Sequence, residues 1–347
     1  MGYFERVLKA CGTEFWINNP TLPELEMALE AGAVGVASNP TYIATLLKKE
    51  PEFVHRVIED LIRESGSADD DEVAASLYQR AVSRPLALCE PLFHDSDGRF
   101  GYAAIQGNPR KNDDLDFLLR EAEGFKGLGK NIIIKMPATV AGAQALEELT
   151  ARGWSTIGTM CFSVSQYIYM AEAHRRGLAR TTEKPRCLIT MLPGMFSEYL
   201  AEDADRRGLG VDGGSLFDAG VATARAAYRV CRERGYEAIV LSGGSRSRAH
   251  WTELLGQDFG ITLSGELTGE LIEADPEISV TLETLSPAEV VAQMRDKFPD
   301  FVRACDIDAI AAEEFRSYGP VVRFQNALTA GLDRALQEVA SRRKQRV

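Results

Sequence analysis

The feature that most constrains the fold of this chain is a repeated alternation of short apolar runs with longer amphipathic stretches. The short runs are typical of strands buried in a parallel sheet, and the stretches between them have the spacing of helices. Eight such runs predict eight parallel strands, at about 14–17, 34–38, 85–89, 131–135, 155–162, 187–192, 238–241 and 261–264. Eight strand–helix units in series predict an α/β fold in which the sheet closes into a (β/α)8 TIM barrel.

The helices are predicted from the segments between these runs. We expect a helix over 22–31 that ends at Gly32, a long helical region over 42–64 and a helix over 73–82. A chain of 347 residues is within the range of a single barrel. We therefore predict one domain over 1–347, with a barrel core at about 14–265 and a C-terminal helical extension at about 285–342.

Composition excludes several classes of function. The net charge of -12 argues against a nucleic acid or an anionic membrane as partner. No apolar stretch reaches the length of a membrane span, and the six cysteines are scattered, which predicts reduced thiols and a cytoplasmic location. The four histidines are isolated, so we expect no metal site. The long C-terminal helices would allow a homodimer.

In a barrel, catalytic groups lie at the C-terminal ends of the strands, where the loops build the site. A carboxylate, a lysine and a hydroxyl that converge there suit chemistry between an amine and a carbonyl. This rule selects as candidates Asn18, Asn39, Glu90, Lys135, Thr159, Ser163, Thr190, and the loop Ser245, Arg246, Ser247 and Arg248.

Lys135 is the most informative of these candidates because it follows a run of three isoleucines. A lysine is costly to bury, so one at the tip of a buried strand usually faces a partner or performs a task. Where desolvation dominates, its pKa falls and the amine becomes a nucleophile able to form a Schiff base. The alternative is a lysine whose charged end reaches solvent at the strand end.

Four segments resemble the transaldolase family, and they occur in the family's order at compatible spacings. The segment 36–41, Val-Ala-Ser-Asn-Pro-Thr, is similar to the family's second-strand signature. The segment 133–139, Ile-Ile-Lys-Met-Pro-Ala-Thr, resembles the lysine strand, and 159–166 resembles the Thr-x-x-Phe-Ser-x-x-Gln segment. Leu88-Cys89-Glu90 occupies the place of the third-strand glutamate. The resemblance implies a TIM barrel and class I aldol chemistry without metal or cofactor.

In that chemistry a ketose would condense with Lys135, its carbon–carbon bond would break, and an aldehyde acceptor would take up the dihydroxyacetone-type unit. By the same resemblance, Glu90 and Thr159 would hold the water that shuttles protons, and Asn39 would hydrogen-bond a donor hydroxyl. Ser163 would line the pocket. Each has a plainer alternative: Glu90 pairs with Lys135, Asn39 only shapes the turn, and Thr159 and Ser163 are ordinary structural residues.

The chain departs from the family pattern at two places. Asn18 stands where the family has an aspartate that acts as acid and base, and an amide cannot take up that proton. Met195 stands where the family has a phosphate-binding arginine. Arg246 and Arg248 remain in a nearby loop, although they could simply be surface arginines. We therefore expect an unphosphorylated or otherwise unusual sugar substrate from a specialised pathway.

Two other functions remain open. The chain could be a class I lyase that releases the donor fragment, in the manner of fructose 6-phosphate aldolase or deoxyribose-phosphate aldolase. It could also be a transaldolase homologue that binds a sugar without catalysis. In each case the expected partner is a small ketose or aldehyde, phosphorylated or not.

Overall fold

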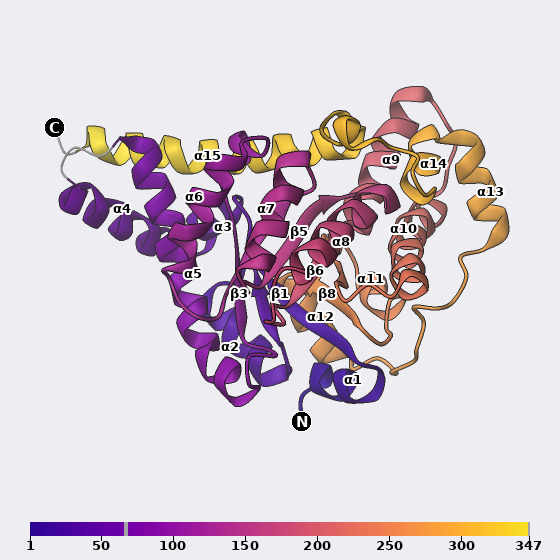
Figure 1. Cartoon of the computed structure of the whole chain (residues 1–347), viewed down its shortest axis with the longest axis horizontal. Helices are drawn as coiled ribbons and strands as arrows, with labels where there is room; N and C mark the ends of the chain where they lie inside the picture. The colour runs from indigo at the N-terminus through magenta and orange to yellow at the C-terminus, as the bar shows by residue number, and fades with distance from the viewer. Residues whose placement is uncertain (66–68, 346–347) are drawn as a thin grey trace.

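The computed structural model describes residues 1–65 and 69–345, and a closed barrel of eight parallel strands lies at its centre (Figure 1). Each strand pairs with the next in sequence, and β8 pairs with β1 to close the barrel. This arrangement confirms the predicted (β/α)8 TIM barrel. The strands are β1 Thr13–Asn18, β2 Gly35–Ala37, β3 Tyr102–Gln106, β4 Ile132–Pro137, β5 Thr156–Cys161, β6 Cys187–Met191, β7 Ile239–Ser242 and β8 Phe259–Leu263.

Helices surround the barrel and follow its strands (Figure 1). Those up to β8 are α1 Tyr3–Cys11, α2 Leu22–Ala31, α3 Tyr42–Lys49, α4 Pro51–Ser65, α5 Asp70–Asp95, α6 Leu115–Lys126, α7 Val140–Ala151, α8 Val164–Leu178, α9 Pro193–Arg207, α10 Gly213–Arg234 and α11 Ala249–Thr252. After β8 come α12 Gly265–Ala274, α13 Ala288–Lys297, α14 Pro299–Cys305 and α15 Gly319–Lys344. Two short 3-10 helices are η1 Pro109–Lys111 and η2 Ala312–Ser317.

Two helix predictions can be compared directly with the structure. Helix α2 ends at Gly32, as predicted, and this glycine adopts the left-handed conformation with φ of 109°. The helical region predicted over 42–64 is instead two helices, α3 and α4. They separate at Glu50 because a residue before proline avoids the helical conformation, and Pro51 begins the next helix.

Alternation along the strands divides the apolar core into an inner and an outer part. The side chains of Ile133, Ile157 and Leu188 belong to one cluster inside the barrel. Ile132 and Ile134, the neighbours of Ile133, belong to a second cluster between the strands and the helices. Residues at even spacing from Ile133, Ile157 or Leu188 therefore point into the barrel.

The prediction of a third strand at 85–89 is wrong, because this segment lies inside α5. Here α5 buries Val82, Leu86 and Cys89 and leaves Ala87 exposed, which is the one-sided burial of a helix. The third strand is instead β3, Tyr102–Gln106. An apolar run of five residues fits either a strand or a helix segment, so its composition alone was ambiguous.

Helix α15 crosses the C-terminal end of the barrel, opposite the N-terminal helix α1 (Figure 1). Its Gly331 lies so close to Pro40 that a Cβ would be 2.9 Å from that carbonyl oxygen. The amide of Gln325 donates to the Pro109 carbonyl, and the Phe324 ring meets that of Phe162 with centroids 6.1 Å apart. One helix thus joins the loops that follow β2, β3 and β5.

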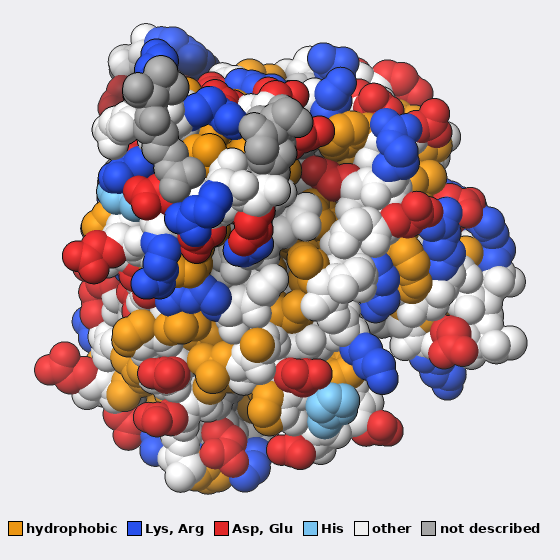
Figure 2. Space-filling model, turned by 90° about the vertical axis from the view of Figure 1, so that its left-hand side faces the viewer, with side chains coloured by type: hydrophobic (Ala, Val, Ile, Leu, Met, Phe, Trp, Pro, Cys, Tyr) orange, Lys and Arg blue, Asp and Glu red, His pale blue; other side chains and the backbone are white. Residues whose placement is uncertain are grey.

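The surface on the α4 and α5 side carries acidic and basic side chains interspersed (Figure 2). All six cysteines are free thiols, and only Cys305 is not fully buried. Among the helices that the structure describes, none is long and apolar enough to cross a membrane.

Candidate active site

The structure places the amine of Lys135 inside the barrel rather than in solvent. Lys135 lies two residues after Ile133 on β4, so its side chain also points inward, and it is 8% exposed. Its Nζ donates a hydrogen bond to the Ser38 carbonyl oxygen at 3.2 Å. Among the described residues, no carboxylate lies within 4 Å of this nitrogen. Desolvation therefore lowers the pKa of Lys135 to about 8.

Gln106 is the residue that the sequence analysis missed at this site. It ends β3, it is buried, and it is the register partner of Lys135 on the neighbouring strand. Within the described part of the chain, neither its Oε1 nor its Nε2 has a hydrogen-bond partner. Because buried amides in native proteins are nearly always bonded, this side chain has both a donor and an acceptor to offer to a molecule in the barrel.

The predicted position of Glu90 is wrong. Glu90 lies on α5, its side chain is 61% exposed, and its Oε1 is 3.7 Å from Nε2 of His94 one turn later. It neither ends a strand nor pairs with Lys135. The position next to the lysine on the third strand belongs to Gln106, so an amide stands where the resemblance had implied a carboxylate.

Thr159 and Thr190 point into the barrel from β5 and β6, as Lys135 does from β4. Both are buried, and each follows by two residues a side chain of the inner cluster, Ile157 and Leu188. Thr159 pairs with Pro137 on the lysine strand. The Thr190 Oγ1 has no hydrogen-bond partner among the described residues. Amide and hydroxyl side chains thus point into the same end of the barrel as the Lys135 side chain.

The two asparagines of the first two strand ends have different surroundings. Asn18 ends β1 and is half-buried. The Asn39 Oδ1 accepts from the backbone nitrogen of Thr41 at 2.9 Å and from its Oγ1 at 2.6 Å. The Asn39 backbone nitrogen donates to Oδ1 of Asn19 at 3.3 Å. The side-chain oxygen of Asn39, Oδ1, therefore shapes the turn before α3. The side-chain nitrogen, Nδ2, remains for a ligand.

Ser163 forms the N-cap of α8. Its Oγ accepts a hydrogen bond from the backbone nitrogen of Gln166 at 3.2 Å and donates to Oε1 of the same residue at 3.3 Å. Both functions of the hydroxyl are thus used within the helix cap, which supports the structural alternative for this residue.

The two arginines of the loop after β7 are paired with glutamates. The guanidinium of Arg246 bonds both carboxylate oxygens of Glu198, and Nε of Arg248 lies 3.8 Å from Oε2 of Glu270. Both arginines are exposed. The neighbouring Ser245 is buried, and its Oγ has no partner within the described residues. A phosphate at this loop would have to compete with carboxylates for the arginines.

His250 lies behind the same loop and does not supply positive charge. It is buried, and its Nδ1 is 3.2 Å from Oγ of Ser247. Desolvation, followed by the charge of Arg246, lowers the pKa of His250 to about 4. The imidazole is therefore neutral at physiological pH.

Tyr78 of α5 contacts Ser38, the residue that binds the Lys135 amine. Its hydroxyl is 2.8 Å from Oγ of Ser38 and accepts from the backbone nitrogen of Gln106 at 3.3 Å. The Ser38 hydroxyl also donates to the Ala104 carbonyl oxygen at 2.6 Å. Tyr78 of α5 thus links Ser38, whose carbonyl oxygen accepts from the lysine amine, to β3, the strand that carries Gln106.

Comparison with known proteins connects this geometry to a family. The family model described as Transaldolase/Fructose-6-phosphate aldolase matches residues 15–316. The transaldolase of Acidothermus cellulolyticus is 26% identical over 268 residues, which are 72% of this chain and 71% of the relative. That of Saccharopolyspora erythraea is 26% identical over 262 residues, 70% of each chain. That of Mycolicibacterium smegmatis is 29% identical over 240 residues, 65% of this chain and 64% of the relative.

Proposed function

Because this chain belongs to the transaldolase and fructose-6-phosphate aldolase family, we propose that it forms a Schiff base between Lys135 and a ketose and transfers a dihydroxyacetone-type unit to an aldehyde. The neutral amine adds to the ketose carbonyl, and loss of water gives the imine. The adjacent carbon–carbon bond then breaks while the hydroxyl proton beside it passes to the water in the site, which releases an aldehyde and leaves an enamine on Lys135. The enamine then attacks the acceptor aldehyde, and hydrolysis frees the new ketose.

The observation that carries this proposal is the burial of Lys135 without a counter-charge. A pKa of about 8 leaves about a tenth of the amine neutral at pH 7, whereas an ordinary lysine would be almost fully protonated. The barrel core and the Ser38 carbonyl hold the amine in one orientation. This combination favours nucleophilic attack over a purely structural role.

Proton transfer at this site is proposed to use a water held by Gln106 and Thr159. An amide can orient a water but cannot take up its proton. The protons released and consumed during imine formation therefore pass between this water, the lysine amine and the substrate hydroxyls. The amide nitrogens of Asn18 and Asn39 are proposed to bind those hydroxyls.

We further propose that the donor is an unphosphorylated sugar of a specialised pathway. Three observations support this: Arg246 is held by Glu198, Arg248 lies beside Glu270, and His250 is neutral. The hydroxyls of Thr190 and Ser245, which lack partners among the described residues, suit the hydroxyl groups of a sugar.

Borohydride reduction tests the imine directly. The enzyme is incubated with dihydroxyacetone, fructose or fructose 6-phosphate, reduced, digested and analysed by mass spectrometry. We expect an adduct on the peptide that contains Lys135, with more adduct from the unphosphorylated ketoses than from the phosphate. If none of the three ketoses adds mass to Lys135, the proposed chemistry is wrong.

Product analysis with and without an added aldehyde distinguishes transfer from cleavage. A transferase forms a new ketose only when the acceptor is present and releases little free donor fragment. A lyase, which uses the same imine, releases the three-carbon fragment in the absence of any acceptor.

A further inference from the structure

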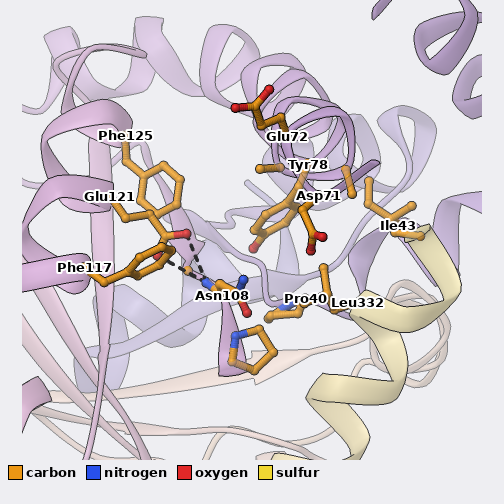
Figure 3. Close-up of a pocket in the computed structure, with 15 residues that line it drawn as sticks. Pro40, Ile43, Asp71, Glu72, Tyr78, Asn108, Phe117, Glu121, Phe125 and Leu332 are labelled. Atoms are coloured by element: carbon orange, nitrogen blue, oxygen red, sulfur yellow. Dashed lines mark hydrogen bonds between the residues drawn. The ribbon is translucent and has the colours of Figure 1, made fainter. Parts of the chain in front are cut away.

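A cavity lies beside the mouth of the barrel, between helices α3, α5, α6 and α15 (Figure 3). Its volume is about 260 Å³. Gly107 and Asn108, which directly follow Gln106 of β3, form part of its lining. The cavity is therefore outside the barrel and separate from the inner cluster around Lys135.

The carboxylate of Glu121 points into this cavity, and a single backbone donor is its hydrogen-bond partner among the described residues. Both oxygens of Glu121 accept from a single donor, the backbone nitrogen of Asn108, at 3.1 and 3.2 Å (Figure 3). Within the ranges that the structure describes, no lysine, arginine or histidine lies within 4 Å of Glu121. Burial raises the pKa of Glu121 to about 7. A carboxylate with several free acceptor sites favours a ligand that brings hydrogen-bond donors and positive charge.

The remaining walls suit the apolar part of such a ligand. Phe117 and Phe125 flank Glu121 on α6, and the ring of Tyr78 faces them from α5 (Figure 3). Cations are attracted to aromatic faces. Asp71 and Glu72 line the α5 side, and the described lining itself contains no lysine or arginine. The nearest basic groups lie at its edge: Arg110 Nη1 is 4.0 Å from Oδ1 of Asp71, and Lys111 Nζ is 5.8 Å from the centroid of the Phe117 ring.

We propose that this cavity binds a small organic cation, an ammonium group on an aromatic or branched aliphatic body. The ammonium pairs with Glu121, and the body lies between the rings of Phe117 and Tyr78. This site is distinct from the ketose site because it combines an acid with aromatic rings, whereas the barrel interior combines an amine with amides and hydroxyls. The proposal does not depend on the chemistry of Lys135.

Calorimetric titration with benzylammonium chloride tests this site on the full chain. Benzyl alcohol is the matched uncharged probe, because it has nearly the same size and body. We expect benzylammonium to bind at least tenfold more tightly than benzyl alcohol, and Glu121→Gln to remove that advantage. Glu123→Gln is the control, because Glu123 lies on the same helix but pairs with Arg152 at the surface. Equal binding of the two probes, or unchanged binding by Glu121→Gln, overturns the proposal.

A second variant locates the ligand without changing any charge. Ala75 lines the cavity from an exposed position of α5, so Ala75→Phe fills the cavity from its edge and should reduce benzylammonium binding at least tenfold. Ala87→Phe, at another exposed position of α5 that does not line the cavity, should bind as the wild type does. Lys135→Met should also retain binding. Loss of binding in Lys135→Met, or retention in Ala75→Phe, shows that the cation binds elsewhere.

Discussion

Lys135 in the barrel is buried and Glu121 in the neighbouring cavity is half-buried, and the two ionisable groups have opposite charges. Each has a single backbone hydrogen-bond partner, Ser38 or Asn108, and neither has an opposite charge within 4 Å in the described part of the chain. Desolvation moves both pKa values toward neutrality, to about 8 and about 7. The same physical cause thus produces a nucleophile in one place and an acceptor for cations in the other.

The surroundings of the two groups explain why each selects a different ligand. Lys135 shares its end of the barrel with amide and hydroxyl side chains such as Gln106 and Thr190, which match the hydroxyls of a sugar. Glu121 is flanked by aromatic rings, which match an apolar cation. Tyr78 belongs to both regions, because its ring lines the cavity and its hydroxyl reaches Ser38.

The largest expected effect comes from Lys135→Met. It removes the nucleophile and should abolish the borohydride adduct and lower turnover by ~10³-fold or more. Stability should not fall, because methionine suits an apolar interior and no longer brings a buried amine. Lys130→Met, which changes an exposed lysine just before β4, is the control in the same adduct and turnover assays. Substantial turnover in Lys135→Met would assign the chemistry to another residue.

Gln106→Glu should place a carboxylate beside the Lys135 amine, so that the two side chains form an ion pair. In the wild type, adduct formation should rise with pH through about 8, because the neutral amine is the nucleophile. A carboxylate beside Lys135 stabilises its protonated form and should raise that midpoint by about one unit, which is about tenfold less neutral amine at pH 7. The measurement is the initial rate of adduct formation against pH.

Gln257→Glu is the matched control for the pH profile, because Gln257 is exposed near the opposite end of the barrel. Its midpoint should equal that of the wild type. An unchanged midpoint in Gln106→Glu would mean that the two side chains do not share the site as their register implies.

Glu198→Gln tests whether paired arginines keep phosphate out of the barrel mouth. The substitution leaves Arg246 without its carboxylate partner, so the KM for fructose 6-phosphate relative to fructose should fall by about threefold to fivefold. The effect is modest because both side chains are partly exposed and solvent screens the pair. Glu202→Gln is the control, since Glu202 pairs with Arg323 but not with Arg246. An unchanged ratio of KM values contradicts this interpretation.

The smallest expected effect comes from Tyr78→Phe, which keeps the ring in the cavity and removes the hydroxyl next to Ser38. The free energy of unfolding, measured with denaturant, should fall by ~1 kcal/mol because one buried hydrogen-bonding group is lost. Benzylammonium binding should be unchanged. Tyr228→Phe is the control for stability, because the Tyr228 hydroxyl has no hydrogen bond to the described residues. A loss of cation binding in Tyr78→Phe would show that the two regions are not separate.

Most of the barrel was predictable because its strands are apolar runs of the right length, such as the isoleucines before Lys135. The third strand was not, since Tyr-Ala-Ala-Ile-Gln contains two alanines and a single β-branched residue. The run at 85–89 is more apolar and competes with it as a strand candidate. Its helical nature could have been found from the spacing of Val82, Leu86 and Cys89, which repeats at four and three residues.

This error also determined what was missed in the site. Assigning the strand to 85–89 selected Glu90 and concealed Gln106, which ends the true strand. Lys135 and Thr159 lie on β4 and β5, whose apolar runs predict strands at the right places. The pairing of Arg246 with Glu198 and the cavity around Glu121 depend on helices that meet only in three dimensions, so no local pattern could indicate them.

The crossing of α15 over the barrel has a consequence for the order in which the protein forms during translation. The loops after β2, β3 and β5 are all in contact with this last helix, which begins only at Gly319. A nascent chain can pair its strands up to β8, at Leu263, before α15 has left the ribosome. The mouth around Lys135 and the cavity around Glu121, which Leu332 and Ala335 of α15 line, are therefore completed only once α15 has left the ribosome, and both binding sites should form together.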